Sequence, residues 1–116
     1  MTVPPRAAIF LSHADPTALR LAGSCALAAA AMGGRVDVFV FGPAVPALVA
    51  AREEEDHAGA ALFRAREAGT VRLLACSASV VEEKVELAAA ERAFDAVVGW
   101  PTVIEWSRGV VERFSF

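Results

Sequence analysis

Short apolar runs alternate along this chain with longer stretches of helical periodicity. The first run, Ala7-Ala8-Ile9-Phe10-Leu11, follows a proline pair and ends at Ser12-His13. A continuous apolar run of this length is typical of a parallel strand that is buried on both faces. Similar runs predict four further strands, the last of them at an edge of the sheet: residues 35–41, 71–75, 94–99 and 110–116.

The segments between these runs have helix signals. Asp15 followed by Pro16 is typical of a helix start, because aspartate caps the first turn and the missing proline N–H costs nothing there. This predicts a helix from Thr17 to Met32, which Gly33-Gly34 ends. The sequence Ser79-Val80-Val81-Glu82 fits a capping box and predicts a helix that starts at about Val80. The remaining helical segments, with this one, are 47–51, 58–68, 80–92 and 102–108.

Strand and helix therefore alternate about four times with short connections. This order favours a parallel sheet covered by helices on both faces, a three-layer α/β sandwich. With 116 residues the chain has room for one sizeable core, so we expect a single domain over residues 1–116. In such folds ligands bind beyond the carboxyl ends of the strands.

Composition narrows the function classes. The net charge is −3 and Lys/Arg residues are not clustered, which argues against nucleic-acid binding and against an anionic membrane surface. No apolar run reaches about 18 residues, so no membrane span is expected. Two cysteines are too few for a secreted disulfide scaffold. We expect a soluble protein of the reducing cytoplasm.

Cys76 has the strongest positional case for chemistry. It lies where a strand passes through a polar turn into a helix, so a thiolate there would face unpaired N–H donors and the positive end of a helix dipole. Its polar neighbours Ser77 and Ser79 argue against full burial, whereas Glu82 and Glu83 would raise a thiol pKa. The alternative is a small core residue at a strand end.

Other residues are expected at the same sheet edge. His13, beside Ser12, could act as a base or an anion-stabilising partner for Cys76, or could be a solvated loop residue. Trp100 could wall a pocket or an interface, and with Gly42-Pro43 it could line a small-ligand site. Each of these loops follows one of the predicted strands.

The remaining candidates favour structural explanations. Cys25 lies mid-helix among alanines and leucines, which is typical of a buried cysteine. Glu53 and His57 form an i, i+4 pair within an acidic segment, but no HExxH, paired CxxC or third ligand accompanies them, so a solvated surface is favoured over a metal site. No GxGxxG or P-loop is present. We therefore expect no metal and no cofactor.

Two segments resemble a known family. Ala28-Ala29-Ala30-Ala31-Met32-Gly33 leading into Val36-Asp37-Val38-Phe39-Val40-Phe41 is similar to the helix-to-strand segment of DsrE/DsrF-like sulfur-relay proteins. Leu74-Ala75-Cys76-Ser77-Ala78-Ser79 is similar to their A-C-x-x-S motif, which carries the family's cysteine. The order of elements matches nearly the whole chain. The resemblance implies a flavodoxin-like sandwich that assembles as a trimer or hexamer.

The resemblance also implies a function. Family members include persulfide carriers of bacterial sulfur oxidation and tRNA thiolation, so Cys76 would accept a sulfane sulfur from a donor protein and pass it to an acceptor. In the closest-looking branch a methionine-rich stretch follows the cysteine, whereas Ser79-Val80-Val81-Glu82-Glu83 follows here. The alternative is a non-catalytic oligomeric binding or scaffold module of the same fold, with Cys76 structural.

Overall fold

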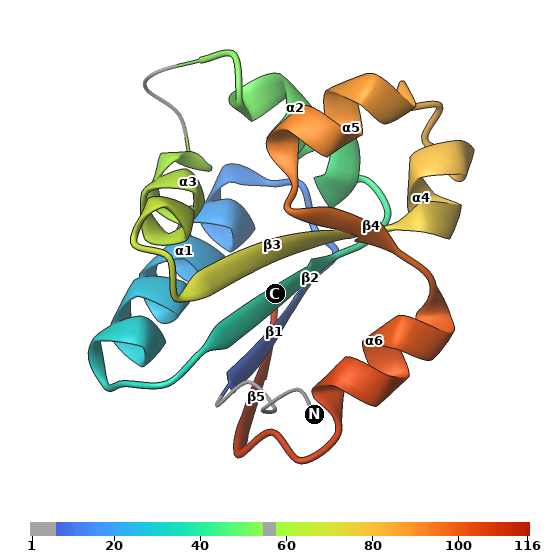
Figure 1. Ribbon diagram of the computed structural model, residues 1–116. Helices are drawn as coiled ribbons and strands as arrows, with labels where there is room; N and C mark the ends of the chain where they lie inside the picture. Colours follow the sequence, from blue (N-terminus) through green and yellow to red (C-terminus); the bar gives the residue numbers. More distant parts are fainter. Residues whose placement is uncertain (1–6, 55–57) are drawn as a thin grey trace.

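The computed structural model describes residues 7–54 and 58–116 and contains a five-stranded parallel sheet (Figure 1). The order of the strands across the sheet is β4-β3-β2-β1-β5, and every neighbouring pair is parallel. Both the expected strand number and the α/β class are confirmed, and β5 is an edge strand. The strands are β1 (Ala7–Leu11), β2 (Val36–Val40), β3 (Val71–Cys76), β4 (Ala96–Val98) and β5 (Glu112–Ser115).

Connection handedness explains how the helices divide between the two faces of the sheet. The chain moves in one direction from β1 to β4, and right-handed crossovers in one direction place their helices on the same face. The chain then returns past β1 to reach β5, which puts α6 alone on the opposite face (Figure 1). The helices are α1 (Pro16–Ala31), α2 (Ala44–Ala51), α3 (Ala60–Glu67), α4 (Ser77–Glu82), α5 (Leu87–Ala93) and α6 (Trp100–Ser107).

The hydrophobic core forms two clusters, one on each face of the sheet. Alternate strand residues such as Ile9, Val38 and Leu73 face the larger helical layer and are fully buried there. Their neighbours Phe39 and Leu74 face α6 and pack with Val103 in a smaller cluster. Because successive side chains of a strand point to opposite faces, the continuous apolar runs of the sequence supply both clusters.

Helix α1 begins and ends as its local sequence predicts. The Asp15 carboxylate accepts a 3.1 Å hydrogen bond from the Ala18 backbone N–H, which caps the first turn beside Pro16. After Met32, Gly33 has a φ of +93°, a left-handed conformation that favours glycine. Along the helix, Gly23 allows close contact with α3: a Cβ atom there would lie 2.6 Å from the Ala61 Cβ.

The helix predicted over residues 80–92 is wrong, because two short helices, α4 and α5, occupy this region. Helix α4 starts at Ser77, directly after Cys76, and ends at Glu82. Lys84 then has a φ of +55°, which breaks the helical path before α5. The predicted capping box is also wrong, because Ser79 lies inside α4 and its hydroxyl accepts a hydrogen bond from the Gly42 N–H instead.

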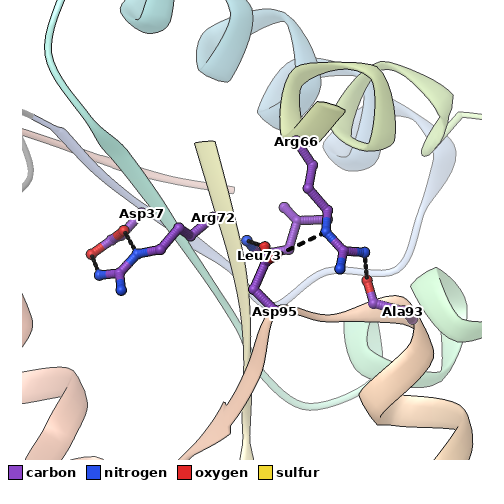
Figure 2. Close-up of polar contacts among 6 residues, drawn as sticks. All are labelled: Asp37, Arg66, Arg72, Leu73, Ala93 and Asp95. Carbon is purple, nitrogen blue, oxygen red and sulfur yellow. Dashed lines mark hydrogen bonds and ion pairs between the residues drawn. The ribbon is translucent and has the colours of Figure 1, made fainter. Parts of the chain in front are cut away.

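Asp95 joins three elements just before β4 (Figure 2). Its carboxylate accepts a 2.8 Å hydrogen bond from the Leu73 backbone N–H in β3 and a 3.0 Å bond from Arg66 Nε in α3. Arg66 also donates to the Ala93 carbonyl at the end of α5. These contacts anchor α3 to the end of α5 and the start of β4.

No helix within the described residues is both long enough and apolar enough to cross a membrane.

Candidate functional site

Cys76 is the last residue of β3 and pairs with Val98 of β4 at the carboxyl edge of the sheet. By the two-residue period of a strand, its side chain faces the same way as Leu74, toward the α6 side. The residue has only 3% of its surface exposed. The expectation that its polar neighbours keep Cys76 from full burial is therefore wrong, because Ser79 is itself buried and only Ser77 reaches the surface.

Ser79 links α4 to the loop after β2. Its Oγ accepts a 2.8 Å hydrogen bond from the Gly42 backbone N–H, and Ser79 is 37 residues away from Gly42 in the chain. Gly42 has a φ of +54°, so the loop turns there in a conformation that favours glycine. The bond holds the helix that directly follows Cys76 against the loop beside it.

The beginning of α6 closes the other side of this edge. Gly99 precedes α6, and a Cβ atom there would lie 3.6 Å from the Ser77 Oγ. Trp100 is 54% exposed, and its ring stacks on Phe41 with centroids 4.9 Å apart. The structure therefore brings Cys76, Ser77, Gly42 and Trp100 to one region of the sheet edge.

Ser12 and His13 lie at the same edge but on the other side of β2. Both are exposed, and the Ser12 Oγ lies 3.4 Å from His13 Nδ1. Strand order places β2 between β1 and β3, so two strand spacings, about 10 Å, separate the end of β1 from Cys76. His13 makes no hydrogen bond to Cys76 within the described part of the chain.

A buried ion pair lies further back on the α6 face and was not among the expected functional residues (Figure 2). Arg72 donates from Nε and Nη2 to the two carboxylate oxygens of Asp37, at 2.7 and 2.8 Å. Asp37 is fully buried, and the Arg72 guanidinium lies 4.4 Å from the centre of the Trp106 ring in α6. The signal in the sequence is an aspartate inside an apolar strand, since a buried charge requires a partner.

These contacts affect the protonation of Arg72. The hydrogen bonds to Asp37 raise the pKa of the Arg72 guanidinium, and burial acts in the opposite direction. Arg72 therefore stays charged beneath Trp106, where a cation is attracted to the face of the indole ring. The pair fixes the position of α6, the helix whose first turn lies beside Cys76.

The second cysteine lies away from this edge. Cys25 is in α1, half-buried, and packs against the larger core. Burial raises the pKa of the Cys25 thiol, and the Glu112 carboxylate of β5 raises it further. A thiol of this kind is a poor nucleophile at neutral pH. The sequence predicted a buried Cys25, and the structure shows a half-buried one.

The described residues include no cluster of metal ligands, and their groove lies away from Cys76. Among residues 7–54 and 58–116, no three His, Cys, Asp or Glu side chains lie close enough to hold a metal ion. Glu53 is exposed, and His57 lies outside the described residues. A groove of about 560 Å³ is present, but it lies between α2, α3 and α5 and includes none of the residues around Cys76.

Comparisons with known proteins concern the fold and the family. The crystal structure of the YchN protein from E. coli superposes with a TM-score of 0.70, covering 97% of this chain and 99% of that chain at 15% identity. At that identity the likeness shows the fold alone. A search of curated protein sequences gives no match. Residues 6–107 match the profile of the DsrE/DsrF-like family, which includes β1 to α6 and the Cys76 edge. The chain belongs to the DsrE/DsrF-like family.

Proposed function

We propose that this protein is a sulfur-relay protein in which Cys76 accepts a sulfane sulfur and carries it as a persulfide. The observation that supports it most directly is the place of Cys76, which ends β3 at the carboxyl edge of the sheet within the motif Ala75-Cys76-Ser77-Ala78-Ser79. Membership of the DsrE/DsrF-like family supports the same chemistry. The second cysteine, Cys25, has a raised thiol pKa and is the weaker candidate.

The proposed step is a thiolate exchange that needs no external oxidant. The Cys76 thiolate attacks the outer sulfur of a donor persulfide and forms a new S–S bond. The bond between the two donor sulfurs breaks, and the donor leaves as a thiolate with the electron pair. Transfer to an acceptor thiol repeats the exchange with Cys76 as the leaving group.

Access to the sulfur is the requirement that the geometry imposes on this step. Cys76 is 3% exposed, so an attacking thiol reaches it only after a neighbouring element moves. Helix α4 is the element best suited to move, because it has six residues and ends at the irregular turn around Lys84. The Ser79 to Gly42 hydrogen bond holds α4 closed in this conformation.

The surrounding residues have supporting roles in this proposal. Ser77 is exposed, and its hydroxyl lies beside Gly99, where it is available to donate to an anionic persulfide once α4 moves. Trp100 and Gly42 form the rim of the same region. Ser12 and His13 are assigned no chemical step, because β2 separates them from Cys76.

Persulfide formation tests the proposal directly. The protein is incubated with a thiosulfate sulfurtransferase and thiosulfate, and its intact mass is measured before and after reduction. We expect the gain of one sulfur atom, removable by a reductant, in the wild type and in Cys25→Ser. Cys76→Ser should gain none. An unmodified wild type, or an equal gain in Cys76→Ser, would refute the proposal.

The burial of Cys76 also favours a second candidate function, a non-catalytic oligomeric scaffold in which this cysteine is a core residue. Reaction with a small thiol reagent at neutral pH separates the two. A structural Cys76 should react only as fast as the protein unfolds globally. A relay Cys76 should react faster than that, because α4 opens locally.

We further propose that the protein is a cytoplasmic homo-oligomer, a trimer or hexamer, that meets donor and acceptor proteins at the Cys76 edge. Several large apolar side chains support an oligomer because they are at least 40% exposed: Leu21, Leu27 and Met32 near α1, and Trp100, Ile104 and Val111 around α6. Light scattering after size-exclusion chromatography tests the assembly. A monomer at micromolar concentration would contradict it.

A further inference from the structure

The groove between α2, α3 and α5 has features that the sulfur-relay proposal does not use. Its volume is about 560 Å³, within the range of about 300–1,000 Å³ that small-molecule sites have. Ala51 and Phe63 supply apolar surface on its walls, and arginines supply most of its polar groups. The groove includes Asp95, which lies just before the first residue of β4. It is therefore at the opposite end of the strand from the carboxyl edge of the sheet, where Cys76 lies.

Four of the ten arginines of the chain line this groove: Arg52, Arg64, Arg66 and Arg92. Arg66 is engaged with Asp95 and the Ala93 carbonyl (Figure 2). The other three are exposed, and their guanidinium groups have no carboxylate partner within the described residues. They come from three places in the chain: the end of α2, α3 and α5.

Helix dipoles account for part of this arrangement. Arg64 and Arg92 lie in the last turns of their helices, and Arg52 directly follows α2. A cation at a helix C-terminus is stabilised by the negative end of the helix dipole. This explains each arginine separately. It does not explain why three arginines with no carboxylate partner among residues 7–54 and 58–116 line one concave surface, where they repel one another.

Among the described residues, four arginines and three carboxylates line the groove. Asp95 is already bound to Arg66, which leaves Glu54 and Glu67 beside Arg52, Arg64 and Arg92. The chain as a whole carries −3, whereas the described lining has one more positive than negative side chain. Arginine forks bind phosphate oxygens in pairs and hold their positive charge at any physiological pH.

We propose that this groove binds a small molecule through a diphosphate group, with Arg52, Arg64 and Arg92 as its ligands. Three arginines from three separate places in the chain suit an anion with several phosphate oxygens better than a single phosphate, and the groove is larger than one phosphate ion. The shared chemistry is the diphosphate, which can come from inorganic pyrophosphate or from a nucleoside diphosphate. Phe63 and Ala51 supply the apolar lining that the ring of a nucleoside would meet in the second case.

Calorimetric titration of the 116-residue chain with pyrophosphate tests the proposal. We expect saturable binding of one ligand per chain at physiological salt. Arg64→Gln and Arg92→Gln should each weaken it about tenfold, which is the loss of one charge-assisted contact. Arg20→Gln is the matched control, because Arg20 is an exposed arginine of α1 that does not line the groove. Unchanged thermal unfolding midpoints would show that the variants fold.

No saturable binding, or equal weakening by Arg20→Gln, would overturn the proposal and indicate general charge attraction. A parallel titration with ADP identifies the source of the diphosphate. Tighter binding of ADP that Phe63→Leu reduces would support a nucleotide, whereas equal affinities for ADP and pyrophosphate would support the inorganic anion.

Discussion

The Ser79 hydroxyl accepts a 2.8 Å hydrogen bond from the Gly42 backbone N–H, across 37 residues of chain. One partner lies in the helix that directly follows Cys76, and the other lies in the loop after the neighbouring strand. The bond satisfies a part-buried backbone donor that has left the sheet. Access to Cys76 should therefore depend on this one contact.

Ser79→Ala should expose Cys76 more often. Removing the hydroxyl leaves the Gly42 N–H unsatisfied and should lower the free energy of unfolding by about 1–2 kcal/mol. The reaction of Cys76 with a thiol reagent should become severalfold faster, in a Cys25→Ser background that leaves one thiol. Ser24→Ala, an exposed serine of α1, is the control and should change neither quantity. An unchanged rate in Ser79→Ala would show that α4 does not control access.

Arg72→Met should destabilise the protein by about 3 kcal/mol, because it leaves the fully buried Asp37 carboxylate without its cation. Combining it with Asp37→Leu should recover part of this loss, since both charges are then absent. Chemical denaturation of the two single variants and the double variant gives the coupling energy.

Arg66→Met provides the comparison for this prediction. The ion pair between Arg66 and Asp95 is more exposed, with side-chain exposures of 27% and 34%. Arg66→Met should therefore lower the free energy of unfolding by only about 1 kcal/mol. Equal losses for Arg66→Met and Arg72→Met would contradict the ranking by burial.

Gly23→Ala should destabilise the contact between α1 and α3. Alanine favours a helix by about 1 kcal/mol over glycine, but the new Cβ would lie 2.6 Å from the Ala61 Cβ. Overpacking costs about 1–3 kcal/mol and should outweigh the gain. Ala61→Gly in the same protein should reverse the effect. A more stable Gly23→Ala single variant would show that the two helices separate easily.

Glu112→Gln should make Cys25 more reactive. Burial raises the Cys25 thiol pKa most, and the Glu112 carboxylate raises it further, so neutralising that carboxylate should lower the pKa. In a Cys76→Ser background, the pH profile of alkylation should move to lower pH than in the Glu112 protein. Glu105→Gln, an exposed carboxylate in α6, is the control and should leave the profile in place. A shift of equal size in both variants would refute the specific role of Glu112.

Local sequence determined most of the secondary structure. The strand predicted at Ala7–Leu11 matches β1, and Asp15-Pro16 marks the start of α1 as expected. Continuous apolar runs identify buried parallel strands because both faces of such strands meet apolar layers. The single helix expected from Val80 to Arg92 is wrong, because α4 already starts at Ser77 and the chain turns at Lys84, which has a φ of +55°. The predicted capping box is wrong because Ser79 lies inside α4 and its hydroxyl accepts a hydrogen bond from the distant Gly42 N–H.

The sequence by itself determined the α/β class, the edge position of Cys76 and the family motif around it. Only the tertiary structure decided how that edge is closed: Cys76 is buried, His13 is beyond β2, and α6 alone covers one face through Arg72, Asp37 and Trp106. The physical reason is that strand periodicity and helix caps act between residues near in sequence. Burial, ion pairing and strand order depend on residues that come together only after folding.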